Sequence, residues 1–149
     1  MILVTGATGF IGSHLMCLLV QKDVFPVAMF RHESNKNNVW KLFESKFSDA
    51  KERYEKITWR KADLRDLPSL NQAFEGVTHV YHCAGYISLA QRDVKKLLEI
   101  NEQGSAYLVN LCLSHSIKKL VYVSSIAALG NEPTTSIIDE NTPWEKNMD

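Results

Sequence analysis

The sequence lacks several features that would assign it to a specialised class of protein. Lys plus Arg and Asp plus Glu number 17 each, so the formal net charge is zero. A balanced chain has no net attraction to nucleic acid or an anionic membrane, and we expect neither as a partner. Away from the N-terminus, the longest apolar run, residues 15–20, is too short to cross a bilayer. The apolar start has no charged segment and is broken by Gly6 and Gly9, so no signal peptide is expected.

Cysteine is also scarce, with Cys17, Cys83 and Cys112 far apart in the chain. This spacing excludes a metal knuckle and a Cys-x-x-Cys redox pair, and we expect no bound metal. Each cysteine has apolar neighbours, which predicts small buried side chains without a reactive thiolate. Unpaired cysteines favour a reducing, cytoplasmic setting.

Short apolar runs alternate with longer segments of helical period. Strands are expected at residues 2–5, 25–30, 57–62, 78–82 and 120–124, and helices at 11–21, 39–54, 67–74 and 93–115. Such alternation predicts an α/β fold, a Rossmann-type doubly wound parallel sheet with right-handed crossovers. Residues 2–5 and 120–124 are nearly all apolar, as expected of strands covered by helices on both faces. Past Gly130 the chain becomes polar and proline-bearing, which predicts a loop where a sixth strand is usual, so we expect a sheet truncated after the fifth strand.

A glycine-rich turn, Thr-Gly-Ala-Thr-Gly-Phe-Ile-Gly at residues 5–12, joins the first strand to the first helix. Gly6 permits the tight turn, Gly9 lets the backbone approach a diphosphate, and Gly12 lets the helix pack on the strand. The helix N-terminus adds unpaired N–H groups and a partial positive charge. Dinucleotide binding is therefore predicted, and an unliganded turn is the alternative. The residues predicted to contact the cofactor here are Gly6, Thr8, Gly9, Phe10, Ile11 and Gly12.

The Gly-x-x-Gly-x-x-Gly spacing resembles the extended branch of the short-chain dehydrogenase/reductase superfamily, the NAD-dependent epimerase/dehydratase family. Four further segments match that family in order: Asp63-Leu64, His-Cys-Ala-Gly at 82–85, Asn101 with Gly104, and Tyr-Val-Ser-Ser at 122–125. Together they span almost the whole chain, and their order and spacing carry the resemblance. Arg31 and the 82–86 stretch favour its dihydroflavonol-reductase-like group. The resemblance implies that residues 1–149 form an incomplete NAD(P)-binding domain, without the sixth strand and the substrate domain.

The residues after the second predicted strand decide between the two nicotinamide cofactors. An acid there binds the 2′-hydroxyl of NAD, whereas an arginine accommodates the 2′-phosphate of NADP. Arg31 stands at this position, with Lys36 nearby, and a guanidinium can bind phosphate through two N–H groups. We therefore favour NADP(H). Glu33 supports the alternative, NAD, and Arg31 would then be a solvated loop charge.

The resemblance also implies roles around the cofactor. Asp63 would accept a hydrogen bond from the adenine amino group and the Leu64 backbone would line the ring, although Asp63 could instead cap a helix. The small residues Cys83, Ala84 and Gly85 would pass beside ribose and diphosphate. His82 is expected to be a core histidine with satisfied hydrogen bonds.

Asn101 falls on the apolar stripe of the helix predicted at 93–115, with Val94, Leu98 and Leu108 among its members. A buried amide needs hydrogen-bond partners. It would either organise backbone or water near the catalytic site or make a purely structural bond, and the sequence does not separate these. Gly104 predicts close packing against a neighbouring element.

The resemblance implies that Ser125 is catalytic, bonding the substrate oxygen, with Ser124 on the nicotinamide side; loop serines satisfying strand-end backbone are the alternative. The family's Tyr-x-x-x-Lys does not occur in the chain, because no tyrosine has lysine four residues later. This chain is therefore expected to bind cofactor without turnover. The full protein would be a homodimer acting on a small molecule. We favour an NADP(H)-dependent oxidoreductase that transfers hydride between a carbonyl and an alcohol. The alternatives are a nucleotide-sugar epimerase or dehydratase that uses NAD, and a non-catalytic module that senses NAD(P).

Overall fold

The computed structural model describes residues 1–125 and 139–140, so the loop expected past Gly130 lies outside the described residues except for that pair. Five strands form one parallel sheet in the order β3-β2-β1-β4-β5. The strands are β1 Ile2–Thr5, β2 Val27–Phe30, β3 Thr58–Lys61, β4 His79–His82 and β5 Lys119–Tyr122. The predicted doubly wound Rossmann-type sheet is confirmed, because the chain moves outward from β1 to β3 and then crosses to β4 on the other side.

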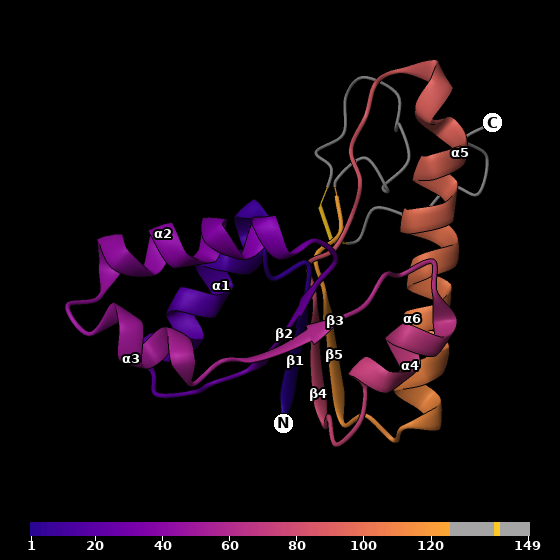
Figure 1. Cartoon of the computed structure of the whole chain (residues 1–149). Helices are drawn as coiled ribbons and strands as arrows, with labels where there is room; N and C mark the ends of the chain where they lie inside the picture. The colour runs from indigo at the N-terminus through magenta and orange to yellow at the C-terminus, as the bar shows by residue number, and fades with distance from the viewer. Residues whose placement is uncertain (126–138, 141–149) are drawn as a thin grey trace.

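Helices cover the two faces of the sheet in separate layers (Figure 1). One layer holds α1 Phe10–Gln21, α2 Lys36–Lys46 and α3 Ala50–Glu55; the other holds α4 Leu67–Ala73 and the long helix that ends as α6 Gly104–Ser114. Successive strand residues supply opposite cores, since Leu3 packs in the α4–α6 layer and Val4 in the α1–α3 layer. This alternation explains why β1 is apolar at every position except Thr5, which is buried.

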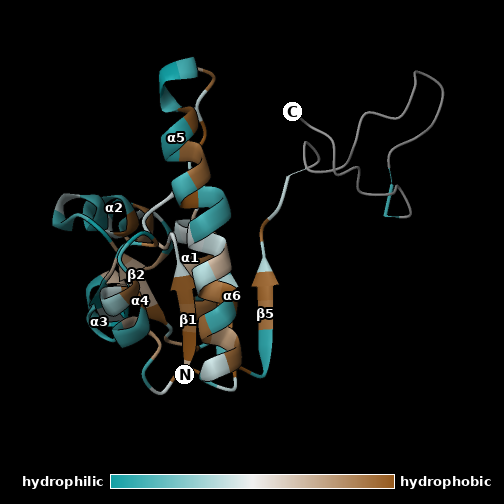
Figure 2. Cartoon of the chain, turned by 90° about the vertical axis from the view of Figure 1, so that its right-hand side faces the viewer, coloured by the Kyte–Doolittle hydropathy of each residue, from teal (hydrophilic) through white to brown (hydrophobic). Residues whose placement is uncertain are grey.

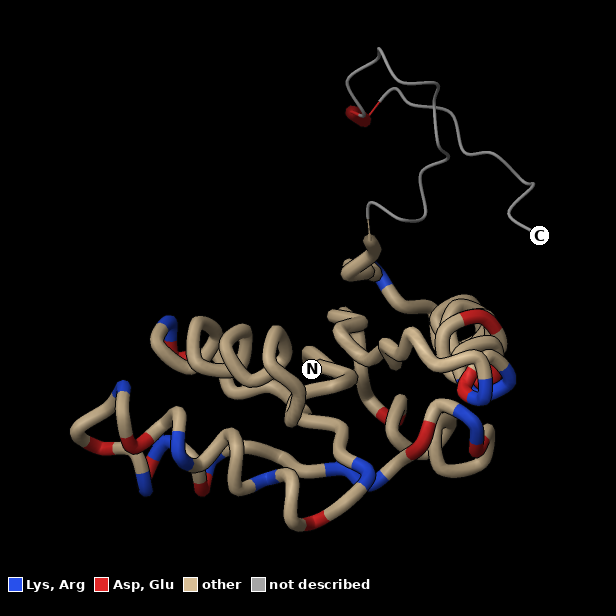
Figure 3. The backbone as a smooth tube through the Cα atoms, turned by 90° about the horizontal axis from the view of Figure 1, so that it is seen from above, with Lys and Arg blue, Asp and Glu red and all other residues tan. Residues whose placement is uncertain are grey.

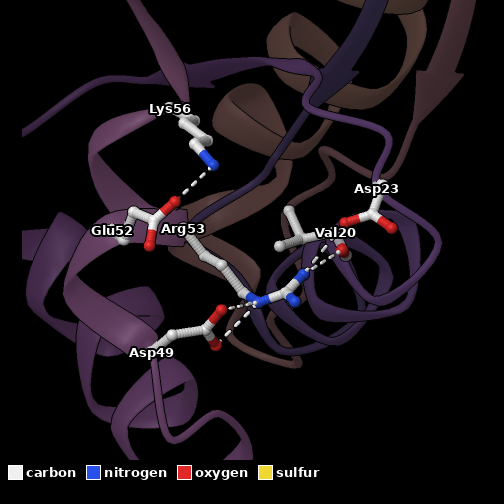
Figure 4. Close-up of polar contacts among 6 residues, drawn as sticks. All are labelled: Val20, Asp23, Asp49, Glu52, Arg53 and Lys56. Carbon is white, nitrogen blue, oxygen red and sulfur yellow. Dashed lines mark hydrogen bonds and ion pairs between the residues drawn. The ribbon is translucent and has the colours of Figure 1, made fainter.

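The segment predicted as one helix at 39–54 is two helices, α2 and α3, and this prediction was wrong. Phe47 has extended backbone angles, φ −127° and ψ 132°, and ends α2. The chain re-enters a helix only at Ala50, after a turn in which Asp49 binds the guanidinium of Arg53 at 2.8 Å. Arg53 also donates to the carbonyl oxygen of Val20 at 2.9 Å, which fixes α3 to the end of α1 (Figure 4).

The helix predicted at 93–115 is not uniform. It begins as α5 Val94–Leu97, passes through the π-helical segment η3 Leu98–Gln103, and continues as α6. A π-helical turn shifts the register of the residues before it relative to those after it. The predicted stripe therefore fails at its start, where Val94 and Leu98 are 50% and 49% exposed, whereas Leu108 is fully buried.

The prediction that helices cover both faces of the fifth strand was also wrong for the described residues. β5 is an edge strand, and Val121, Tyr122 and Val123 are 38%, 49% and 40% exposed. Figure 2 shows β5 at the end of the sheet, hydrophilic at its start and apolar further along. An edge strand has one neighbouring strand, so burial depends on helices packing against it.

Charged positions of both signs are interspersed over the helices of both layers (Figure 3). Within the described part of the chain, no helix is long and apolar enough to cross a membrane.

Candidate functional site

A groove opens at the carboxyl ends of the strands where the strand order reverses, between β1 and β4. Open α/β sheets bind ligands at this switch point because the loops after the two central strands diverge to opposite faces. The groove has a cavity volume of about 190 Å³. Its lining comes from the segments that follow β1, β2, β3 and β4, from β2 itself and from η3, and is formed by Gly6, Thr8, Gly9, Met29, Arg31, Asn35, Asp63, Leu64, Cys83, Ala84, Gly85 and Ile100.

The glycine turn forms the floor of the groove and is built around close backbone approaches. Gly6 has φ +64°, a left-handed conformation that favours glycine. A Cβ on Gly6 would lie 2.6 Å from the backbone nitrogen of Ala84, so the loops after β1 and β4 can meet only without a side chain. A Cβ on Gly12 would clash with the Gly6 carbonyl oxygen. Gly6 and Gly12 therefore shape the turn, as the sequence predicts.

Helix α1 begins directly at the groove. Gly9 is its N-cap residue and caps without a side-chain hydrogen bond. The first N–H groups of a helix lack intrahelical partners and can bind an anion. Of the predicted contacts in this turn, Gly6, Thr8 and Gly9 line the groove, while Phe10 and Ile11, with side chains 82% and 51% exposed, lie outside its lining. Those two residues and Gly12 can contribute through the backbone of the first turn of α1.

One end of the groove carries a free guanidinium. Arg31 directly follows β2, is exposed, and forms no ion pair or side-chain hydrogen bond with residues 1–125 or 139–140. Glu33 is instead bound to Lys36 at 2.8 Å and lies outside the lining of the groove. The Lys36 ammonium is also 4.1 Å from the centroid of the Phe30 ring, which holds the pair beside β2. Of Arg31 and Glu33, the two candidates to contact the adenosine ribose, Arg31 thus lines the groove and Glu33 does not.

Asp63 lies on the same end of the groove and carries a defined negative charge. Both carboxylate oxygens accept from Arg65: Oδ1 from Nε at 3.1 Å and from the backbone N–H at 3.0 Å, and Oδ2 from Nη2 at 2.9 Å. The hydrogen bond from Arg65 is the main reason that the pKa of Asp63 is lowered, and the positive charge of Arg31 adds to the effect. Asp66, not Asp63, is the N-cap residue of α4.

Leu64 is buried and presses against the start of α6. A Cβ on Gly104 would lie 2.8 Å from Cβ of Leu64, so the predicted close packing at Gly104 is confirmed. The neighbouring Ile100, in the π-helical segment η3, is 5% exposed and lines the same groove.

The loop after β4 also lines the groove, through Cys83, Ala84 and Gly85. Burial raises the pKa of the Cys83 thiol, so the thiolate is disfavoured. Burial likewise raises the pKa of Cys17 to about 11. No described cysteine therefore offers an activated nucleophile.

His82, at the end of β4, is a core histidine with both ring nitrogens hydrogen-bonded, as predicted. Nδ1 lies 2.7 Å from Oγ1 of Thr5, and Nε2 lies 3.1 Å from Oγ of Ser105. The ring is 1% exposed, and burial lowers its pKa to about 4. A neutral His82 thus links β1, β4 and the long helix beneath the groove.

Asn101 anchors the loop after β4 to the long helix. Its side-chain amide donates to the carbonyl oxygen of Tyr86 and accepts from the Tyr86 N–H, both at 2.8 Å. The side chain of Asn101 does not line the groove, although its oxygen would be 3.6 Å from a Cβ on Gly85. The structure therefore shows a hydrogen-bonded anchor for the groove wall.

Sequence reasoning missed three lining residues, Met29, Asn35 and Ile100. Asn35 could have been found from its position after β2. Ile100 lies in the π-helical segment η3, whose shifted register a constant helical period does not predict. Ser124 and Ser125 follow β5, which ends at Tyr122 and not at 124 as predicted. Both serines are exposed and lie outside the lining of the groove. The structure brings Gly6, Thr8, Gly9, Arg31, Asp63, Leu64 and Cys83 to Gly85 together in one groove, and leaves Phe10, Ile11, Gly12, Asn101 and the serine pair outside its lining.

The pattern of the NAD dependent epimerase/dehydratase family matches residues 2–148. The chain is 30% identical over 152 residues to sterol demethylase protein B of Methylococcus capsulatus, covering 97% of this chain and 42% of that protein. It is 28% identical over 142 residues to dihydroflavonol 4-reductase of Dianthus caryophyllus, covering 95% of this chain and 38% of that protein. It therefore spans about two fifths of these relatives.

The fold is also shared with solved structures. The Thermus thermophilus UDP-glucose 4-epimerase, solved in complex with NAD, superposes with a TM-score of 0.71 at 25% identity, over 97% of this chain and 44% of that one. Sequence motifs, groove and topology thus agree with the family match. The chain belongs to the NAD dependent epimerase/dehydratase family, whose members use NAD(P) and include reductases and epimerases.

Proposed function

We propose that this chain is the cofactor-binding part of an NADP(H)-dependent reductase that transfers hydride between a carbonyl and an alcohol. The observation that carries the proposal is the guanidinium of Arg31, which lines the groove and has no ion-pair partner in the part of the chain that the structure describes. Glu33, the acid that would favour NAD, is held by Lys36 at 2.8 Å. A guanidinium binds a phosphate through paired N–H groups, so the adenosine end suits a 2′-phosphate.

The glycine turn fits the diphosphate of the same cofactor. The backbone at Gly6 and Gly9 leaves a surface without side chains beside the N-terminus of α1, where a helix dipole favours anions. Asp63 would accept from the adenine amino group, with the Leu64 backbone along the ring. Cys83, Ala84 and Gly85 would then lie beside the ribose and diphosphate, and Asn101 would support them through Tyr86.

The bound cofactor supplies or accepts the hydride. Ser124 and Ser125 follow β5 at the carboxyl edge of the sheet, and we assign Ser125 to the substrate oxygen and Ser124 to the nicotinamide side. A hydroxyl group that donates a hydrogen bond to a carbonyl oxygen stabilises the negative charge that develops on that oxygen during hydride addition. We further propose that the substrate is a small molecule and that the whole protein acts as a homodimer. Residues 1–149 alone are expected to bind cofactor without turning substrate over.

A second candidate function is an NAD-dependent sugar-nucleotide epimerase. It is favoured by the structural likeness to the UDP-glucose 4-epimerase that was solved with NAD. The two candidates differ in the group at the adenosine ribose, which makes the cofactor preference the deciding measurement.

Titration of the chain with NADPH and NADH, followed by nicotinamide fluorescence, tests the proposal. We expect tighter binding of NADPH. The Arg31→Ala variant should lose about tenfold or more for NADPH, the range for a charge-assisted phosphate contact, and little for NADH. Glu33→Gln is the matched control in the same loop and should change neither value more than about twofold, as is usual for exposed ion pairs. Equal losses for both nucleotides in Arg31→Ala would refute the phosphate role.

A further inference from the structure

Two arginines, Arg31 and Arg65, act on the carboxylate of Asp63. Asp63 and Arg31 both line the groove, and the charge of Arg31 acts on Asp63. Arg65 holds both oxygens of Asp63, at 3.1 Å and 2.9 Å. Arg31 itself has no ion-pair partner among residues 1–125 and 139–140. The Asp63 carboxylate thus binds Arg65 and not Arg31.

The pairing of Asp63 with Arg65 affects how strongly an anion can bind to Arg31. A carboxylate without Arg65 would attract the Arg31 guanidinium, which lines the groove with Asp63 and whose charge already acts on it. It would also repel a phosphate bound there, because like charges at close range disfavour each other. Engagement of Asp63 by Arg65 reduces both effects and keeps its oxygens in one orientation.

We propose that Arg65 is a positioning residue that sets the preference for NADP(H) over NAD(H), by occupying Asp63 so that Arg31 stays available to the 2′-phosphate. This inference rests on the proposed function, since it presumes that Arg31 recognises that phosphate. Arg65 acts through Asp63 and does not itself touch the phosphate.

Three variants separate this role from its alternatives. Arg65→Met removes the charge and keeps an apolar stem, while Asp63→Asn with Arg65→Met removes the competing carboxylate as well. Arg92→Met removes an exposed arginine from the 3-10 turn η2 Gln91–Asp93, away from the groove lining, and controls for the loss of one positive charge. Dissociation constants for NADPH and NADH are measured for each variant at one fixed, low salt concentration, because exposed charges are screened by salt.

We expect Arg65→Met to lower the ratio of NADPH to NADH affinity by at least about fivefold, within the range for directly coupled charged groups. The double variant should recover most of that ratio, because no carboxylate remains to capture Arg31. The recovery concerns the ratio, since loss of Asp63 would weaken both nucleotides through adenine. Arg92→Met should leave the ratio unchanged.

Other outcomes overturn the inference in recognisable ways. If Arg65→Met leaves the ratio unchanged while Arg31→Ala still reduces it, the positioning role is wrong and the proposed function stands. If Arg65→Met lowers the ratio and the double variant does not recover it, Arg65 contacts the phosphate directly and the positioning role is again wrong. If the unaltered chain shows no preference for NADPH, the proposed function itself fails first.

Discussion

Replacement of Gly6 by alanine tests the geometry on which the whole groove depends. The alanine Cβ would lie 2.6 Å from the Ala84 nitrogen and 2.7 Å from the Ala84 Cα and the Cys83 carbonyl carbon. All three atoms belong to backbone, which cannot turn aside as a side chain can. The loops after β1 and β4 would have to separate, and His82 ties these same strands together through Thr5.

Two costs add in this variant. Placing alanine at φ +64° costs about 1–2 kcal/mol, because a left-handed conformation brings Cβ toward the following carbonyl. Forcing a methyl group against packed backbone costs a further 1–3 kcal/mol or so. We therefore expect Gly6→Ala to lower the free energy of unfolding by about 2–5 kcal/mol and the melting temperature by about 10 °C.

Gly9→Ala is the matched control, because it adds the same methyl group within the same turn. Gly9 has an ordinary φ of −81°, and its added Cβ would lie 3.2 Å from the Gly6 carbonyl oxygen. The fold should adjust at a cost of roughly 1 kcal/mol or less. The methyl group would still occupy the groove lining, so NADPH binding should weaken by about tenfold, the effect of losing one close contact to the diphosphate.

The assay pairs thermal unfolding by circular dichroism with NADPH titration. Gly6→Ala should lose both stability and binding, and Gly9→Ala should lose binding alone. Equal melting temperatures for Gly6→Ala and the unaltered chain would refute the steric argument. Unchanged NADPH affinity in Gly9→Ala, with the fold intact, would place the diphosphate elsewhere.

Two further predictions concern the supports beneath the groove. Burial lowers the pKa of His82 to about 4, whereas a histidine in the unfolded chain titrates near 6.5. Between these pH values the unfolded state binds one more proton than the folded state. The free energy of unfolding should therefore fall as the pH drops from about 6.5 to about 4, by up to about 3 kcal/mol. The free energy of unfolding, measured with urea across this pH range, should depend less steeply on pH in His82→Gln than in the unaltered chain. An unchanged pH dependence would contradict the assignment. Asn101→Leu should cost about 2–3 kcal/mol, because both hydrogen bonds to Tyr86 are lost and its backbone groups are left without those partners. The exposed Asn110→Leu on α6 should cost less than about 0.5 kcal/mol, and a similar loss in both variants would deny Asn101 its anchoring role.

Much of the fold followed from local patterns. The strand at 2–5 and the turn at 5–12 are where the sequence placed them, since buried parallel strands need apolar residues and the turn needs glycine. The break between α2 and α3 was not predictable from periodicity, because Phe47 continues the apolar spacing while its backbone is extended. Likewise, the π-helical segment is invisible to a pattern that assumes one constant period.

The candidate site divides in the same way. Glycine spacing by itself determined the tight turn between β1 and α1, because that constraint acts on the backbone over a few residues. Tertiary structure alone decided that Glu33 turns to Lys36, that Asp63 binds Arg65, and that Arg31 has no such partner within residues 1–125 and 139–140. It also decided that Asn101 holds Tyr86. Partner choice among charged and polar side chains depends on distances set by packing, which a linear sequence does not contain.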